Sequence, residues 1–134
     1  MKLENVIFEG HATPADFKSA ASGHSETSFL IEWTSRSFTQ IEKFLLEVRP
    51  SQTSTEWKKY KITPSDEGAY EYAGKEFLGN LTSATPYSAR VTARNAEGWG
   101  SPSKVWNFAT KGAGGYQLTI LDVIIQKSSK NAAV

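Results

Sequence analysis

The sequence predicts an all-β fold in which seven short antiparallel strands form a two-layer sandwich. The composition is one basis for this prediction. It has 15 Ser and 12 Thr residues beside 12% aromatic residues, a mixture typical of short strands joined by polar turns. Apolar and polar residues also alternate at period two in several segments, and turn-forming clusters separate these segments. No apolar stripe with the 3.6-residue period of a helix persists along the chain.

The first four predicted strands are residues 13–19, 29–33, 41–49 and 57–62. In the second strand, Phe29, Ile31 and Trp33 fall on one face, which is typical of a half-buried strand. Residues 42–48 are the one arguable helical window. We predict a strand there because alternate residues from Phe44 onward are apolar and face the core.

The last three predicted strands are residues 77–81, 87–94 and 104–110. A turn cluster at residues 64–68 precedes them, and a Gly-rich loop at residues 95–103 separates the last two. The strand at 87–94 alternates most regularly. Its predicted inward residues are Tyr87, Ala89, Val91 and Ala93. Seven short strands with frequent turn signals indicate an antiparallel β-sandwich.

The order of these residues resembles the fibronectin type III family over roughly residues 14–110. Trp33 stands where the family keeps the tryptophan of its second strand, and Phe44 stands where a tyrosine is usual on the third. Two longer motifs add to the resemblance. They are the corner formed by Leu81, Thr85 and Tyr87, and the run Ala93, Asn95, Gly98, Gly100 and Ser103.

The sequence departs from the family pattern at two of these positions. Ser83 replaces the corner proline, with Pro86 added beside the tyrosine, and Phe44 lacks a hydroxyl. Tyr87 can still bond to upstream backbone, so the resemblance implies a seven-stranded immunoglobulin-like sandwich. We expect the domain to cover residues 13–111, with a flank at 1–12 and a Gly-rich linker and apolar segment at 112–134.

Both flanks of the expected domain contain short apolar segments, at residues 5–8 and 118–125. Segments rich in β-branched residues pair readily with the exposed edge of a sheet. The Gly-rich stretch at 112–115 would let the C-terminal segment reach an edge of its own sandwich or of a second copy. Pairing with a second copy would make a homodimer. Disorder of one or both flanks is the alternative.

We predict no catalytic residue, no cofactor site and no metal site. The chain has no cysteine, which excludes disulfides, thiolate metal sites and a cysteine nucleophile. His11 and His24 both precede the second predicted strand and lack metal-ligand spacing. The Gly-rich stretch lacks the Lys-Ser/Thr ending of a phosphate-binding loop. A net charge of +1 gives no drive toward nucleic acid.

One modification site and one contact region are predicted. Asn80 begins an Asn-Leu-Thr glycosylation sequon, and strand alternation points its side chain outward because Leu81 should face the core. Trp99 lies between two glycines, where it either folds back on Arg94 or stands exposed as an interface residue. Arg90 and Arg94 form a basic row with cations of a neighbouring strand. Glutamates interleave with this row, so a mixed solvated face is favoured over a heparin-like patch.

The local sequences of residues 12–19, 26–33 and 37–44 resemble those of a subtype of the family. It is similar to the single membrane-proximal fibronectin type III domain that follows immunoglobulin domains in insect neuronal adhesion proteins of the Klingon and Wrapper kind. The resemblance implies a non-catalytic, extracellular protein-interaction or spacer module of a cell-surface adhesion protein. An anchor outside this chain would hold it to the membrane, and its protein partner would be homophilic or heterophilic. A spacer of an intracellular muscle-type filament protein and a stalk domain of a receptor ectodomain are the alternatives.

Overall fold

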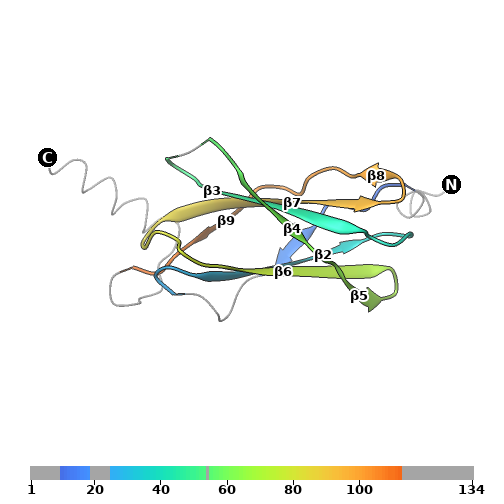
Figure 1. The fold of residues 1–134 in the computed structure, drawn as a ribbon, viewed down its shortest axis with the longest axis horizontal. Coiled ribbons are helices and arrows are strands. Elements are labelled where there is room, and N and C mark those ends of the chain that lie inside the picture. Colours follow the sequence, from blue (N-terminus) through green and yellow to red (C-terminus); the bar gives the residue numbers. More distant parts are fainter. Residues whose placement is uncertain (1–9, 19–24, 54, 113–134) are drawn as a thin grey trace, which may run out of the picture.

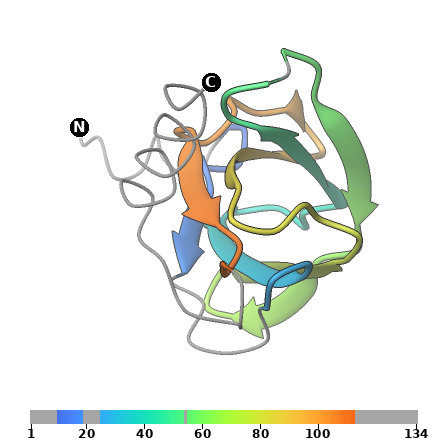
Figure 2. The ribbon, with the colours of Figure 1, turned by 90° about the vertical axis from the view of Figure 1, so that its left-hand side faces the viewer.

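The computed structural model describes residues 10–18, 25–53 and 55–112, whose strands form two antiparallel sheets packed face to face (Figures 1 and 2). One sheet has the order β1-β2-β6-β5. The other has the order β4-β3-β7-β8, and β9 also pairs with β7. The strands are β1 (Asp16–Lys18), β2 (Phe29–Arg36), β3 (Lys43–Pro50), β4 (Lys58–Ile62), β5 (Ser65–Gly68), β6 (Glu71–Leu78), β7 (Pro86–Asn95), β8 (Gly98–Trp99) and β9 (Trp106–Ala109).

The predicted fold class is confirmed, but the described residues contain nine strands and not seven. The turn predicted at residues 64–68 is mostly strand β5, which pairs with β6 through a register that shifts between Asp66 and Gly68. Two residues of the predicted Gly-rich loop form β8, which pairs with the end of β7. β6 begins at Glu71, six residues before its predicted start, because its whole length pairs with β2.

The core lies between the sheets and has Trp33 near its centre. Trp33 is fully buried, and its ring meets that of Phe44 edge to face with centroids 5.5 Å apart. The other core residues follow from alternation along the strands, since side chains at every second position of a strand point to the same side. The predicted inward residues of β7 are all buried: Tyr87, Ala89, Val91 and Ala93. The aromatic core also extends to Phe17 and Trp106, whose rings stack at 5.1 Å.

Hydrogen bonds close the loop that precedes β7. The backbone N–H of Thr82 donates to the Tyr87 hydroxyl at 2.9 Å, as expected for a corner tyrosine. The Thr110 hydroxyl donates to the Thr82 carbonyl at 2.7 Å. It also accepts from the Thr85 N–H at 3.1 Å. One buried hydroxyl thus joins the loop before β7 to the residue after β9, and buried polar groups satisfied in this way stabilise the corner.

Asn95 fixes the loops at the opposite end of the sandwich. Its side chain is almost fully buried, and Nδ2 donates to the Ser37 hydroxyl and to the Gly10 carbonyl, both at 3.0 Å. Its Oδ1 accepts from the Glu97 N–H at 2.9 Å. The turn between β7 and β8 is therefore held in place, and with it the position of Trp99. The predicted apolar flanks at residues 5–8 and 118–125 lie outside the described residues.

Candidate interaction surface

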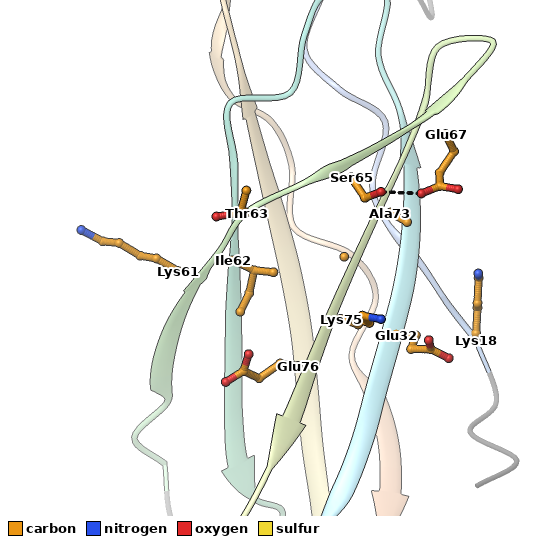
Figure 3. Close-up of a pocket in the computed structure, with 11 residues that line it drawn as sticks. Lys18, Glu32, Lys61, Ile62, Thr63, Ser65, Glu67, Ala73, Lys75 and Glu76 are labelled. Carbon is orange, nitrogen blue, oxygen red and sulfur yellow. Dashed lines mark hydrogen bonds between the residues drawn. The ribbon is translucent and has the colours of Figure 1, made fainter. Parts of the chain in front are cut away.

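A pocket of about 570 Å³ opens between β4 and β6 (Figure 3). Three lysines and three glutamates line it, and Ser65 Oγ donates to Glu67 Oε2 at 2.6 Å on its rim. Its lining contains no histidine and no cysteine. Within the described ranges, no three His, Asp or Glu side chains are grouped to hold a metal ion. No helix in these ranges is long and apolar enough to span a bilayer.

The ionisable side chains are instead segregated between the two sheets. The strands β3, β4, β7, β8 and β9 contain seven Lys and Arg residues and one Glu. The strands β1, β2, β5 and β6 contain three Lys and Arg residues and six Asp and Glu residues. The net charge of +1 for the whole chain conceals this division. From the sequence, only the basic row of Arg90 and Arg94 with cations of a neighbouring strand was predicted, and not the charge difference between the two sheets.

Six of these cations share the outer side of their sheet, which we call the cationic face. Its members are Lys43, Arg49, Lys59, Lys61, Arg90 and Arg94. Strand register brings them together, because Lys59 pairs with Glu47, which pairs with Arg90 on the next strand. Arg94 pairs with Lys43 on one side and with Trp99 on the other. The intervening residues of β3 and β7 point into the core.

Arg90 is held in a fixed position on the cationic face. Its Nε donates to Glu47 Oε1 at 2.9 Å and its Nη2 to Glu47 Oε2 at 3.4 Å, and Glu47 itself is buried. The guanidinium carbons of Arg49 and Arg90 each lie 4.2 Å from the centroid of the Trp57 ring. Arg90 is thus restricted by both a cation–π contact and a two-pronged carboxylate contact, and Arg49 by its cation–π contact and a hydrogen bond to the Thr55 carbonyl at 3.2 Å. Trp57 is the first residue of the strand predicted at 57–62, but it precedes β4 and its ring supports these arginines.

Trp99 combines both arrangements that the sequence allowed. Its ring centroid lies 5.8 Å from the guanidinium carbon of Arg94, yet 42% of the residue is exposed. Arg94 also pairs with Glu42 at 3.2 Å. Both members of that ion pair are solvated, so it contributes little to stability. Trp99 and Arg94 therefore form an accessible aromatic–cation unit at one end of the cationic face.

The fibronectin type III domain family model matches residues 13–109. The chain belongs to the fibronectin type III family. A comparison with curated protein sequences gives no match. Among solved structures, the fibronectin type III domain of human contactin 1 is 21% identical with a TM-score of 0.54, over 80% of this chain and 82% of that one.

Two further solved structures show how widely this fold is shared. The domain of human collagen alpha-1(XX) is 18% identical with a TM-score of 0.57, over 81% of this chain and 90% of that one. The sensor domain of the anti-sigma factor RsgI4 from Pseudobacteroides cellulosolvens is 21% identical with a TM-score of 0.53, over 75% of this chain and 97% of that one. At these identities the similarity establishes the fold of this fibronectin type III domain.

The sequon residue Asn80 of this fibronectin type III domain is exposed, but strand alternation is not the reason. It lies in the loop after β6 with a φ of 56°, and not on a strand. Asn tolerates this left-handed region better than most residues, so the loop suits its side chain. Leu81, expected to face inward, is partly buried and packs against the core.

Proposed function

We propose that this fibronectin type III domain is a non-catalytic interaction and spacer module of an extracellular adhesion or recognition protein of the immunoglobulin superfamily. Solved relatives of the same fold include domains of a contactin and of a collagen, which supports a cell-surface or matrix setting. The subtype resemblance of the first half of the chain supports a membrane-anchored neuronal protein. Asn80, as an exposed sequon residue, supports passage through the secretory pathway.

The observation that carries the proposal is the unit formed by Trp99 and Arg94, with Arg90 on the same face of β7. Tryptophan and arginine are the residue types most enriched in the energetic centres of protein interfaces. Trp99 is 42% exposed, and Arg90 is pre-positioned by Glu47 and Trp57. Pre-positioned side chains lose less conformational entropy on binding. The protein partner, a second copy or another protein, would contact this end of the cationic face.

Binding of the multimerised chain to cells that display the partner tests this proposal. Trp99→Ala and Arg94→Ala should each weaken binding about fivefold or more, the loss expected for an interface residue worth about 1 kcal/mol. Thermal stability should stay within experimental scatter for Arg94→Ala. The matched control is Phe77→Ala, since Phe77 is 58% exposed on the other sheet. Equal effects of Phe77→Ala and Trp99→Ala would refute the assigned surface.

We also infer that the apolar segment at residues 118–125 acts in homodimer formation by strand addition. The supporting observation is its Ile, Val and Leu content beside a Gly-rich linker. Deletion of everything after Gly115 should convert the dimer to monomer in light scattering. A full-length chain that is strictly monomeric at high concentration would exclude this mode of association.

A further inference from the structure

One edge of β9 has no partner strand among the described residues, in which β9 pairs with β7 alone. We propose that this free edge accepts residues 118–122 of a second copy, so that two chains exchange these segments reciprocally. The inference rests on the proposed homodimer and names the surface that its C-terminal segment contacts. That surface is distinct from the unit formed by Trp99 and Arg94.

The edge of β9 is the one least protected against pairing. Among the edge strands of the described residues, β4 has three lysines in five residues, and β1 and β5 each contain two charged residues. The open part of β6 contains Lys75 and Glu76, and β8 has only two residues. β9 has the sequence Trp-Asn-Phe-Ala, without a charged side chain. Because charges and short length are what keep a further strand from an edge, β9 is the edge of this sandwich best suited to accept one.

The backbone of β9 presents hydrogen-bonding groups at this edge. Ala109 pairs with Pro86, which has no N–H and whose carbonyl accepts from the Ser51 N–H at 3.0 Å on the other side of β7. Ala109 therefore makes no backbone hydrogen bond to β7. Because bonded and non-bonded pairs alternate in an antiparallel ladder, Asn107 makes none either. The N–H and C=O groups of Ala109 and Asn107 thus point to the free edge, where an added strand can pair with them.

A mostly apolar groove of about 400 Å³ lies between β1 and the segment that leads into β9. Figure 2 shows β1 and β9 at the same margin of the sandwich. The rings of Phe17 and Trp106 stack at 5.1 Å and join the two sheets there, and Val105 is 49% exposed. The other lining residues are Pro14, Ala15, Asp16 and Lys104. An apolar segment on the β9 edge would cover this groove and remove the exposed parts of these apolar side chains from water.

The sequence of the C-terminal segment complements this edge in one antiparallel register. With Asp122 opposite Lys104, each apolar residue of the segment meets an apolar residue, and each polar residue meets a polar one. The pairs are Leu118 with Phe108, Thr119 with Asn107, Ile120 with Trp106, Leu121 with Val105 and Asp122 with Lys104. A shift by one residue in either direction would place Thr119 opposite an aromatic ring and Asp122 opposite an uncharged residue. Lys104 is exposed and takes part in neither ion pair of the described residues, so its charge can pair with Asp122.

The exit of the chain from β9 favours a segment from a second copy over the segment of the same chain. The Lys111 N–H donates to the Ser25 carbonyl at 3.0 Å, and the Lys111 carbonyl accepts from the Ala84 N–H at 2.9 Å. The chain is thus fixed between two other segments just beyond β9, and a tight hairpin back onto the same edge would have to pass Ser25. A segment of a second copy reaches the edge without this restraint. Reciprocal exchange covers both edges in one closed dimer with two-fold symmetry.

Full-length variants with one altered charge each test the exchange between chains. Lys104→Glu places a like charge opposite Asp122, and Asp122→Lys places a like charge opposite Lys104. Each variant alone should dimerise about tenfold more weakly than the unaltered chain in sedimentation equilibrium, because both charge pairs of the dimer become repulsive. An equimolar mixture of the two variants should dimerise about as well as the unaltered chain, since each edge then receives a segment of opposite charge. A mixture that dimerises no better than its components would overturn the exchange.

A second pair of variants tests the backbone of β9. Asn107→Pro removes an N–H group that points to the free edge, whereas Asn107→Ala keeps it, and both lose the hydrogen bond from the Ser88 hydroxyl to Asn107 Oδ1 at 2.9 Å. Asn107→Pro should weaken the dimer at least tenfold, and Asn107→Ala should dimerise as the unaltered chain does. If Asn107→Pro fails to fold, as judged by circular dichroism, Val105→Lys is compared with Phe77→Lys, which adds the same charge at an exposed position of β6. Only Val105→Lys should weaken the dimer, and equal effects of the two lysine substitutions would contradict the proposed edge.

The same measurements separate the accepting edge from the dimer itself. A dimer that is lost on deletion of everything after Gly115 but kept in Lys104→Glu and Asn107→Pro would overturn β9 as the acceptor and leave the proposed homodimer standing. A dimer that survives the deletion, or a full-length chain that is strictly monomeric at high concentration, would overturn both. Trp99→Ala should leave the dimer unchanged, because Trp99 lies outside the β9 edge and the groove beside it.

Discussion

Gly74 lies directly opposite Trp33 in the β2–β6 ladder, and the indole ring of Trp33 fills the space that a side chain at Gly74 would need. A Cβ atom built at Gly74 would lie 2.4 Å from Cε2 and Cζ2 of Trp33. The φ of Gly74 is not positive, so the glycine is needed for close approach and not for an unusual backbone. The core tryptophan and a glycine on the neighbouring strand thus form one packing unit.

Gly74→Ala should lower the free energy of unfolding by about 1–3 kcal/mol, the usual range for overpacking a core. The added methyl group must displace either the Trp33 ring or the β6 backbone. Urea unfolding followed by Trp fluorescence measures the effect. The control is Gly79→Ala, because a Cβ at Gly79 meets nothing within 4 Å. Equal stabilities of the two variants would contradict the packing described for Trp33.

Much of the sandwich follows from alternation in the sequence. The inward residues of β2, β3 and β7 were predicted correctly, because a strand covered on one face must place apolar residues at every second position. β5 left no such signal. Its four residues are all exposed and polar or glycine, and only backbone pairing with β6 makes them a strand. The start of β6 at Glu71 could not be predicted from alternation either, because Gly74 interrupts the apolar pattern of this strand.

The candidate interaction surface was predictable in part. A contact between Trp99 and Arg94 was one of the two arrangements that the sequence allowed, and the ring lies 5.8 Å from the guanidinium carbon. Lys59 and Lys61 join the same face as Arg90 only through the register of three strands, which a single sequence does not specify. The stack of Arg49, Trp57 and Arg90 also depends on residues from separate segments.

The turn between β5 and β6 contains backbone strain that can be relieved. Ala69 and Tyr70 both have positive φ, at 52° and 63°, where Asn-Gly would be the favoured pair. Left-handed conformations cost about 1–2 kcal/mol for residues with a Cβ atom. Ala69→Gly should therefore raise the free energy of unfolding by about 1 kcal/mol. The change leaves the contact between Phe38 and Tyr70, whose ring centroids lie 5.3 Å apart, in place.

The matched control for this turn is Ala73→Gly, at the third residue of β6. Glycine in a regular strand lowers stability by about 0.5–1 kcal/mol, because it raises the entropy of the unfolded chain. The same substitution should thus have opposite signs at the two positions in urea unfolding. Destabilisation at both positions would show that Ala69 is not strained.

Glu76 protects an open edge of the first sheet. Within the described residues, β5 pairs with β6 only as far as Ala73, so the part of β6 from Gly74 onward has a free edge. Glu76 pairs with Ile31, which points to the core, and a charge on the inner side of an edge strand opposes pairing with another chain. Glu76→Val should therefore increase self-association, measured as weight-average mass by light scattering.

Glu32→Val is the control for that edge, because Glu32 lies on β2, between β1 and β6, with strands on both sides. It removes the same charge and adds the same apolar side chain without altering an edge. Self-association that increases equally in both variants would mean that surface hydrophobicity is the cause, and that Glu76 has no special role at the edge.

Asn80 should carry an N-linked glycan when the chain is secreted from insect cells. The side chain is exposed in the loop after β6, and the sequon residue Thr82 is also exposed. A secreted product should show an intact mass raised by a core glycan, and peptide-N-glycosidase should remove this difference. Thr82→Ala is the sharpest control. It destroys the sequon but keeps Asn80 and the hydrogen bond from the backbone N–H of residue 82 to the Tyr87 hydroxyl. A correctly folded, secreted chain with an unmodified mass would contradict the prediction and weaken the extracellular assignment, since an accessible sequon in the secretory pathway is a substrate for the transferase.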